Sequence, residues 1–201
     1  MKPSRVLLMA SAVAVAVPLV AVAQGKTPAK PKMSKQAQRG EYLVRIAGCH
    51  DCHTPLAMGP QGPAPDMTKM LSGHPEGMQL PPPPAPSGPW IVSFLATNTA
   101  MAGPWGVSYA ANITSDKETG IGSWTEKQFV QAMRTGKHMG QGRPILPPMP
   151  WQNAAAMTDE DLKAVFAYLQ ATPALKNKIP EPTPPAAAPA GTPAPADGTK
   201  K

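Results

Sequence analysis

Apolar residues recur at helical spacing in three stretches, which predict helices at about residues 34–48, 125–135 and 158–172. The first helix is expected to place on one face the residues Tyr42, Leu43, Ile46 and Ala47. The last helix is expected to bury a stripe made of Leu162, Val165, Phe166 and Leu169. Pro173 then ends this helix, because proline cannot continue the backbone hydrogen bonding.

The middle helix carries signals at both of its ends. Thr125 and Gln128 have the spacing of a capping box, and Trp124 is placed to contact Phe129 across the first turn. Gly136 is suited to the left-handed position that follows a helix. These signals predict a helix that ends near residue 135.

Between the first two helices the regular pattern disappears. Residues 54–112 contain twelve prolines among Gly, Ser and Met. A connection of this length without regular structure is unusual inside a compact domain. Where one occurs, it usually has a function or surrounds another part of the molecule. We therefore expect an irregular insertion at residues 54–111.

Both ends of the chain differ in composition from its middle. Residues 1–23 have a basic start, an apolar run and the small residues Ala21 and Ala23, which together predict an export signal. The predicted domain at residues 35–175 follows a Lys/Pro linker at residues 24–34, and a disordered Pro/Ala-rich tail is expected at residues 176–201. The sequence predicts a periplasmic protein, which an uncleaved signal segment would anchor to the membrane.

The charge balance argues against a nucleic-acid partner. The chain has 201 residues and a formal net charge of +7. Residues 35–172, however, hold ten Lys or Arg and ten Asp or Glu, so the excess lies in the flanks. A nucleic-acid-binding protein would concentrate basic side chains on its folded surface.

The chemistry is concentrated in one short motif. The only two cysteines, Cys49 and Cys52, are separated by two residues and followed directly by His53. This is the spacing of a c-type haem attachment site, in which both thiols bind one haem covalently and the histidine is the proximal iron ligand. The sequence thus predicts one haem c on Cys49 and Cys52, with His53 on the iron.

Three other interpretations of the cysteine pair remain open at this stage. A disulfide would close only a very small loop. A thioredoxin-like redox pair belongs near a βαβ pattern, which the sequence lacks. A zinc site needs four ligands, and adjacent Cys52 and His53 are awkward on one tetrahedral ion. The export signal favours haem.

A sixth iron ligand has to come from elsewhere in the chain. Met149 is flanked by Pro148 and Pro150, which restrict the backbone and can hold its thioether toward the iron. We therefore predict Met149 as the distal ligand. Weaker candidates are Met139, His138, His74 and Met78. His50, inside the motif, is expected to face solvent.

Two parts of the sequence resemble the class I c-type cytochromes. Residues 39–54 are similar to their first helix and attachment site, and residues 148–169 to their ligand loop and last helix. The resemblance implies that these helices cross with Gly40 against Phe166 or Tyr168. It also implies an all-α cytochrome c fold of three to four helices around one haem, here with the long insertion.

The middle of the chain is also similar to the cytochrome subunits of periplasmic dehydrogenases. The matching stretches are residues 71–75, 102–106 and 112–125. Those subunits often carry two or three attachment motifs, whereas this chain has one. Electrons therefore cannot pass from one haem to another within this chain.

The leading hypothesis is a monohaem electron carrier and not an enzyme. Iron ligated by both His53 and Met149 has no open position, which suits outer-sphere transfer of single electrons between redox partner proteins. Two alternatives are a cytochrome module of a dehydrogenase or respiratory complex, and a haem peroxidase.

Overall fold

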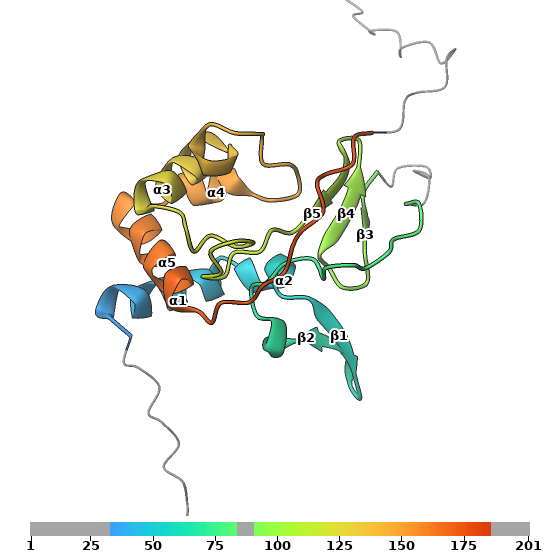
Figure 1. Cartoon of the computed structure of the whole chain (residues 1–201), viewed down its shortest axis with the longest axis horizontal. Helices are drawn as coiled ribbons and strands as arrows, with labels where there is room; N and C mark the ends of the chain where they lie inside the picture. Colours follow the sequence, from blue (N-terminus) through green and yellow to red (C-terminus); the bar gives the residue numbers. More distant parts are fainter. Residues whose placement is uncertain (1–32, 84–90, 186–201) are drawn as a thin grey trace, which may run out of the picture. The chain divides into compact units, whose positions relative to one another are not determined.

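The structure is a computed structural model that describes residues 33–83 and 91–185, all within the second of two units, residues 33–201. The predicted signal segment and most of the linker lie outside the described residues. Figure 1 shows the helices and strands, which in chain order are α1 (Lys35–Ile46), α2 (Cys49–His53), β1 (Leu56–Gly59), β2 (Gly62–Pro65), η1 (Met67–Lys69), β3 (Ser93–Phe94), β4 (Ala100–Gly103), β5 (Gly106–Tyr109), α3 (Glu126–Thr135), η2 (His138–Gly140), α4 (Trp151–Ala155) and α5 (Asp159–Ala171).

The three predicted helices are present as α1, α3 and α5, each with a side-chain cap at its start. The Ser34 hydroxyl accepts from the Ala37 amide at 3.1 Å, and the Thr158 hydroxyl accepts from the Asp161 amide at 3.1 Å. At the start of α3, Thr125 and Gln128 form the predicted capping box. These bonds satisfy amides that have no partner within their own helix.

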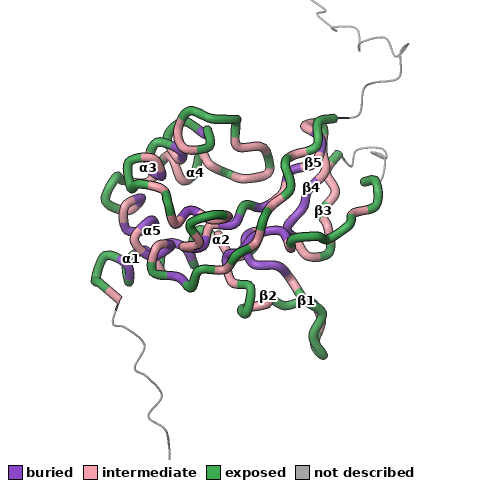
Figure 2. The backbone as a smooth tube through the Cα atoms, in the orientation of Figure 1, coloured by how far each residue is buried: buried purple, intermediate pink, exposed green. Residues whose placement is uncertain are grey.

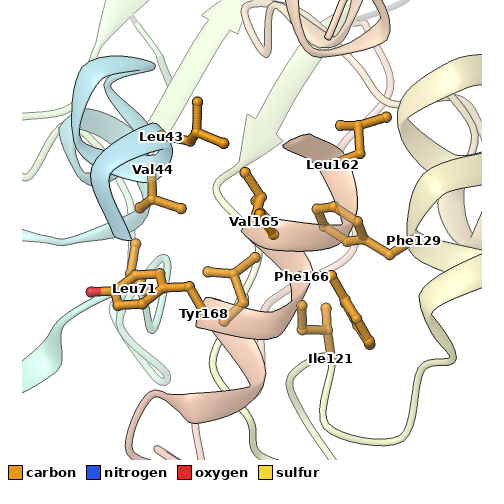
Figure 3. Packing of buried hydrophobic residues seen from close by; sticks show 11 residues of the cluster. Leu43, Val44, Leu71, Ile121, Phe129, Leu162, Val165, Phe166 and Tyr168 are labelled. Atoms are coloured by element: carbon orange, nitrogen blue, oxygen red, sulfur yellow. The ribbon is translucent and has the colours of Figure 1, made fainter. Parts of the chain in front are cut away.

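Helices α1 and α5 cross at Gly40. A Cβ at Gly40 would clash with the Ala164 carbonyl oxygen and would lie 2.8 Å from Cβ of Tyr168. Of the two aromatic residues that the resemblance allowed, Tyr168 is therefore the one at this crossing. Phe166 instead packs against Phe129 of α3, with ring centroids 5.4 Å apart (Figure 3).

The apolar faces of the helices are only partly as predicted. All four residues of the α5 stripe are buried, as expected. On α1, Leu43 and Val44 are buried, whereas Tyr42 and Ile46 are 54% and 60% exposed. The shift follows from the crossing, because the face that contains Gly40 is the one turned toward α5.

Substitution of Gly40 by alanine is expected to destabilise the fold. In an exposed helix this change would stabilise by about 0.5–1 kcal/mol. Here the added methyl group meets backbone atoms of α5, so we expect a loss of about 1–3 kcal/mol in the free energy of unfolding. Denaturant unfolding of Gly40→Ala should be compared with Gln36→Ala, an exposed position on the same helix. A Gly40→Ala variant as stable as the wild-type protein would contradict the close crossing.

The insertion is more regular than the sequence predicted, and the all-α expectation is wrong there. Strands β1 and β2 form an antiparallel hairpin, and β3, β4 and β5 form a three-stranded antiparallel sheet. The strands are only two to four residues long, and β2 contains two prolines, so no alternation of apolar residues marks them. The described part of the fold is thus mostly helical with two small sheets.

Parts of the insertion also belong to the buried interior. Leu71 and His74 are fully buried, as is Thr99 before β4. Figure 2 shows buried backbone outside the helices as well as along α1 and α5. The insertion therefore contributes to the core that supports α2.

The structure also differs from the disordered tail expected from residue 176. We call residues 173–183 the C-terminal strap, which runs from the end of α5 to β5 (Figure 1). The Thr183 and Val107 backbones exchange hydrogen bonds of 2.8 and 2.9 Å. The expectation was wrong for this segment because it counted apolar side chains, whereas hydrogen bonds hold the strap. Residues 186–201 lie outside the described residues.

No helix within residues 33–83 and 91–185 has the length and apolar character needed to cross a membrane.

Candidate functional site

The cysteine motif forms its own short helix, α2, directly after α1. Gly48 joins the two helices with a φ of 67°, a left-handed conformation that favours glycine. Both Cys49 and Cys52 are half-buried, and they are not joined by a disulfide. The structure therefore places both thiols and the following His53 on a single turn of helix.

The environment of the thiols does not suit redox or zinc chemistry. Burial raises the pKa of Cys49 to about 11 and also raises the pKa of Cys52. A nucleophilic or metal-binding cysteine needs the thiolate form, which a lowered pKa would favour. Among the described residues, no three His, Cys, Asp or Glu side chains are grouped as a metal site. The thioredoxin-like and zinc interpretations thus find no support here.

His53 is held in the state that an iron ligand requires. Its ring is buried, and burial lowers its pKa, so the imidazole is neutral at neutral pH. Nδ1 lies 2.8 Å from the carbonyl oxygen of Ala111, which can only accept, so Nδ1 carries the proton. The lone pair is then on Nε2. A hydrogen bond from the second ring nitrogen is the usual means of orienting a metal-binding histidine.

Two segments of the insertion, residues 71–73 and Ala111, bond to the C-terminal end of α2. The Gly73 amide donates to the His53 carbonyl oxygen at 2.8 Å. The Leu71 amide donates to the hydroxyl of Thr54, the residue after His53, at 3.0 Å. Gly73 therefore binds the last carbonyl of α2 and Leu71 binds the side chain just after it, while Ala111 contacts the His53 ring.

Met149 lies half-buried in the loop between η2 and α4. The Ile145 amide donates to the Gly136 carbonyl oxygen at 2.7 Å. The Ser108 hydroxyl donates to the Pro147 carbonyl oxygen, also at 2.7 Å. The loop is therefore tied both to the end of α3 and to β5.

The same short segment contacts both the loop of Met149 and His53. Ser108 binds the Pro147 carbonyl oxygen, and Ala111, three residues later, binds the His53 ring. Three residues of extended backbone span at most about 11 Å. Residues 108–111 therefore bond to both the loop of Met149 and the His53 ring, and the donor set on α2 fits haem c.

The other candidate ligands lie in varied surroundings. His74 is fully buried, with Nδ1 3.1 Å from the Thr99 hydroxyl and no hydrogen-bond partner for Nε2 among the described residues. His138 packs edge-on against Trp124, at 5.0 Å between ring centroids. The His50 ring is half-buried and lies 3.0 Å from the Thr54 hydroxyl, so it does not simply face solvent as expected. Met139 is half-buried, and Met78 is exposed.

Sequence reasoning missed the residues that support His53. Ala111 acts through its backbone carbonyl, which any residue type could supply, so the sequence carries no signal for it. Asn112, beside it, is a polar residue that the structure buries to 3% exposure. Asn112 begins residues 112–125, which resemble the cytochrome subunits of dehydrogenases. That resemblance was the only sequence signal for this residue.

Comparisons with known proteins give the relationship of the chain. No family model matches it. It is 29% identical over 171 residues, 84% of the chain and 28% of the relative, to the cytochrome c subunit of an alcohol dehydrogenase (quinone) of Gluconobacter oxydans. It is 33% identical over 131 residues, 65% of the chain and 22% of the relative, to the gluconate 2-dehydrogenase cytochrome c subunit of Pantoea cypripedii.

A third relative is the fructose dehydrogenase cytochrome subunit of Gluconobacter japonicus, 29% identical over 150 residues, 72% of the chain and 24% of the relative. In each alignment the chain spans about a quarter of the relative's length. The names of these relatives agree with the predicted haem motif and with the resemblance to the cytochrome subunits of dehydrogenases. The chain is a distant homologue of the cytochrome c subunits of dehydrogenases.

Proposed function

We propose that this protein is a monohaem c-type cytochrome that carries single electrons between redox partners outside the cytoplasm. The observation that carries the proposal is the arrangement of α2, where Cys49 and Cys52 precede a buried, neutral His53 whose Nδ1 donates to Ala111. Cys49 and Cys52 would hold haem c covalently. His53 and Met149 would be the proximal and distal iron ligands.

When bound, the haem would supply an iron that changes between the ferric and ferrous states. The residues of this chain would fix its surroundings. The Ala111 carbonyl keeps the His53 ring in one tautomer and orientation, and the bonds to Ile145 and Pro147 hold the loop of Met149. A rigid ligand set changes little between oxidation states, which favours electron transfer. If His53 and Met149 both bound the iron, no coordination position would remain for a substrate.

A second candidate is a cytochrome module that works within a dehydrogenase complex. It is favoured by the relatives, which are named as cytochrome subunits of dehydrogenases. The chain matches about a quarter of their length and carries one attachment motif, so it would correspond to a single haem domain. The electron donor would then be a dehydrogenase. Co-purification of such an enzyme with the native protein would distinguish a module of a complex from a free carrier.

The proposal is tested by optical spectra of the exported protein, made in cells that mature c-type haem. We expect a sharp low-spin spectrum after reduction, because two strong-field side chains ligate the iron. The reduced spectrum should not change when CO is added, since CO would have to displace Met149. Rapid CO binding would favour the peroxidase alternative, and a protein without covalent haem would contradict the proposed function.

A further inference from the structure

The C-terminal strap is hydrogen-bonded to one of the two segments that support His53. Nδ2 of Asn177 donates to the carbonyl oxygens of Ser72 and His74, at 2.6 and 2.8 Å. Between these two residues lies Gly73, whose amide donates to the His53 carbonyl oxygen. The Ser72 carbonyl and the Gly73 amide belong to one planar peptide group, so the strap is bonded directly to the peptide that binds the backbone of α2.

Asn112 joins the strap to the other supporting segment. Its Nδ2 donates to the carbonyl oxygens of Leu175 and Asn177 in the strap, at 2.7 and 3.3 Å, and to the Thr119 hydroxyl at 3.1 Å. Its Oδ1 accepts from the amide and the hydroxyl of Thr114, at 3.0 and 2.7 Å. Every polar atom of this buried side chain is thus paired.

The pairing of Asn112 bears directly on the ring of His53. The nitrogen of Asn112 and the carbonyl of Ala111 belong to one planar peptide group, so a fixed Asn112 fixes the direction of that carbonyl. The carbonyl accepts the proton of His53 Nδ1 at 2.8 Å. Outer hydrogen bonds of this kind raise the basicity of a histidine ligand and are one of the means by which a protein sets a haem potential.

We propose that the C-terminal strap is the outer positioning layer of the proximal haem ligand, and that it acts through Asn112 and Asn177. The strap holds the Ala111 carbonyl against His53 Nδ1 and holds residues 72–74 against the backbone of His53. It thereby lowers the midpoint potential, because a more basic imidazole favours ferric iron. This inference rests on the proposed function, since it concerns His53 as an iron ligand.

The test is the midpoint potential of the full-length holoprotein with Asn112→Ala. The variant should keep its covalent haem and its low-spin spectrum. A loosened Ala111 carbonyl weakens the bond to Nδ1, so the potential should rise. We expect the ratio of ferrous to ferric protein at a fixed potential to increase about threefold, which corresponds to about 28 mV for one electron. In the reduced protein, the NMR signal of the Nδ1 proton should exchange faster with solvent.

Two further variants keep the inference falsifiable. Asn177→Ala removes the side-chain bonds to the Ser72 and His74 carbonyl oxygens and to the Glu76 amide, and it carries the test if Asn112→Ala yields no holoprotein. Lys176→Ala is the matched control in the strap, because it removes an exposed ion pair to Glu118 and should leave the potential unchanged.

The outcomes separate this inference from the proposed function. If Asn112→Ala and Asn177→Ala lower the melting temperature but leave the potential equal to that of Lys176→Ala, the strap is only structural and the inference is overturned. A wild-type protein without covalent haem would overturn the proposed function, and this inference with it.

Discussion

Serine in place of both Cys49 and Cys52 is expected to abolish covalent haem. The wild-type protein should exceed the mass of its polypeptide by one haem, and that haem should remain on the protein through acid-acetone extraction. The chain has only these two cysteines, so no other thiol can replace them. Intact mass spectrometry measures the difference directly. Each single variant, Cys49→Ser or Cys52→Ser, is expected to retain at most one thioether bond.

Asp51→Asn is the matched control for this prediction. It lies in the same short helix between the two cysteines, but its side chain is exposed. It should therefore keep both thioether bonds and the wild-type spectrum. Haem that is extracted from the wild-type protein, or a double serine variant that still gains the mass of a haem, would contradict attachment at these two residues.

The helices were predictable because their signals are local. Ser34, Thr125 and Thr158 each stand before an apolar-periodic stretch and cap a helix, and the cap at Thr125 was predicted from its capping box. The two small sheets were not predictable, since strands of two to four residues show no clear alternation. Their order depends on hairpin turns such as that at Gly106, where φ is 94° and the strap passes close by.

The strap shows why composition alone misled the prediction of a tail. Residues 173–183 carry few large apolar side chains, and the cost of ordering a backbone is about 1–2 kcal/mol per residue. What offsets this cost is pairing with distant residues: the Asn112 side chain and the Val107 backbone bond to the strap, and the strap's own Asn177 side chain bonds to the Ser72 carbonyl. Such pairing between distant residues has no signature in a single stretch of sequence.

The candidate site divides in the same way. The spacing of Cys49, Cys52 and His53 predicts haem attachment, and the structure adds that all three lie on one short helix. The contact of Ala111 could not be predicted, because Ala111 lies 58 residues after His53 in the sequence and acts through its backbone carbonyl. Met149 is intermediate. Its flanking prolines single it out, whereas the contact that brings its loop to β5, between Ser108 and Pro147, is seen only in the fold.

Replacement of Met149 by alanine is expected to leave the haem attached but to change the iron's sixth ligand. The weak thioether-to-iron band at the long-wavelength end of the oxidised spectrum should disappear. Because a thioether favours ferrous iron, the midpoint potential should fall when water or a nearby histidine replaces the sulfur. The reduced variant should also bind CO rapidly, which the wild-type protein should not do. Spectra and potentiometric titration of the holoprotein measure all three effects.

Met139→Ala is the control that decides between Met149 and Met139 as the predicted distal ligand. Met139 is half-buried in η2, and Met149 is half-buried in a loop tied to Ser108, a residue of the same short segment as Ala111. If Met149 is the ligand, Met139→Ala should keep the thioether band, the potential and the resistance to CO. If Met149→Ala keeps the band and Met139→Ala loses it, η2 supplies the distal ligand.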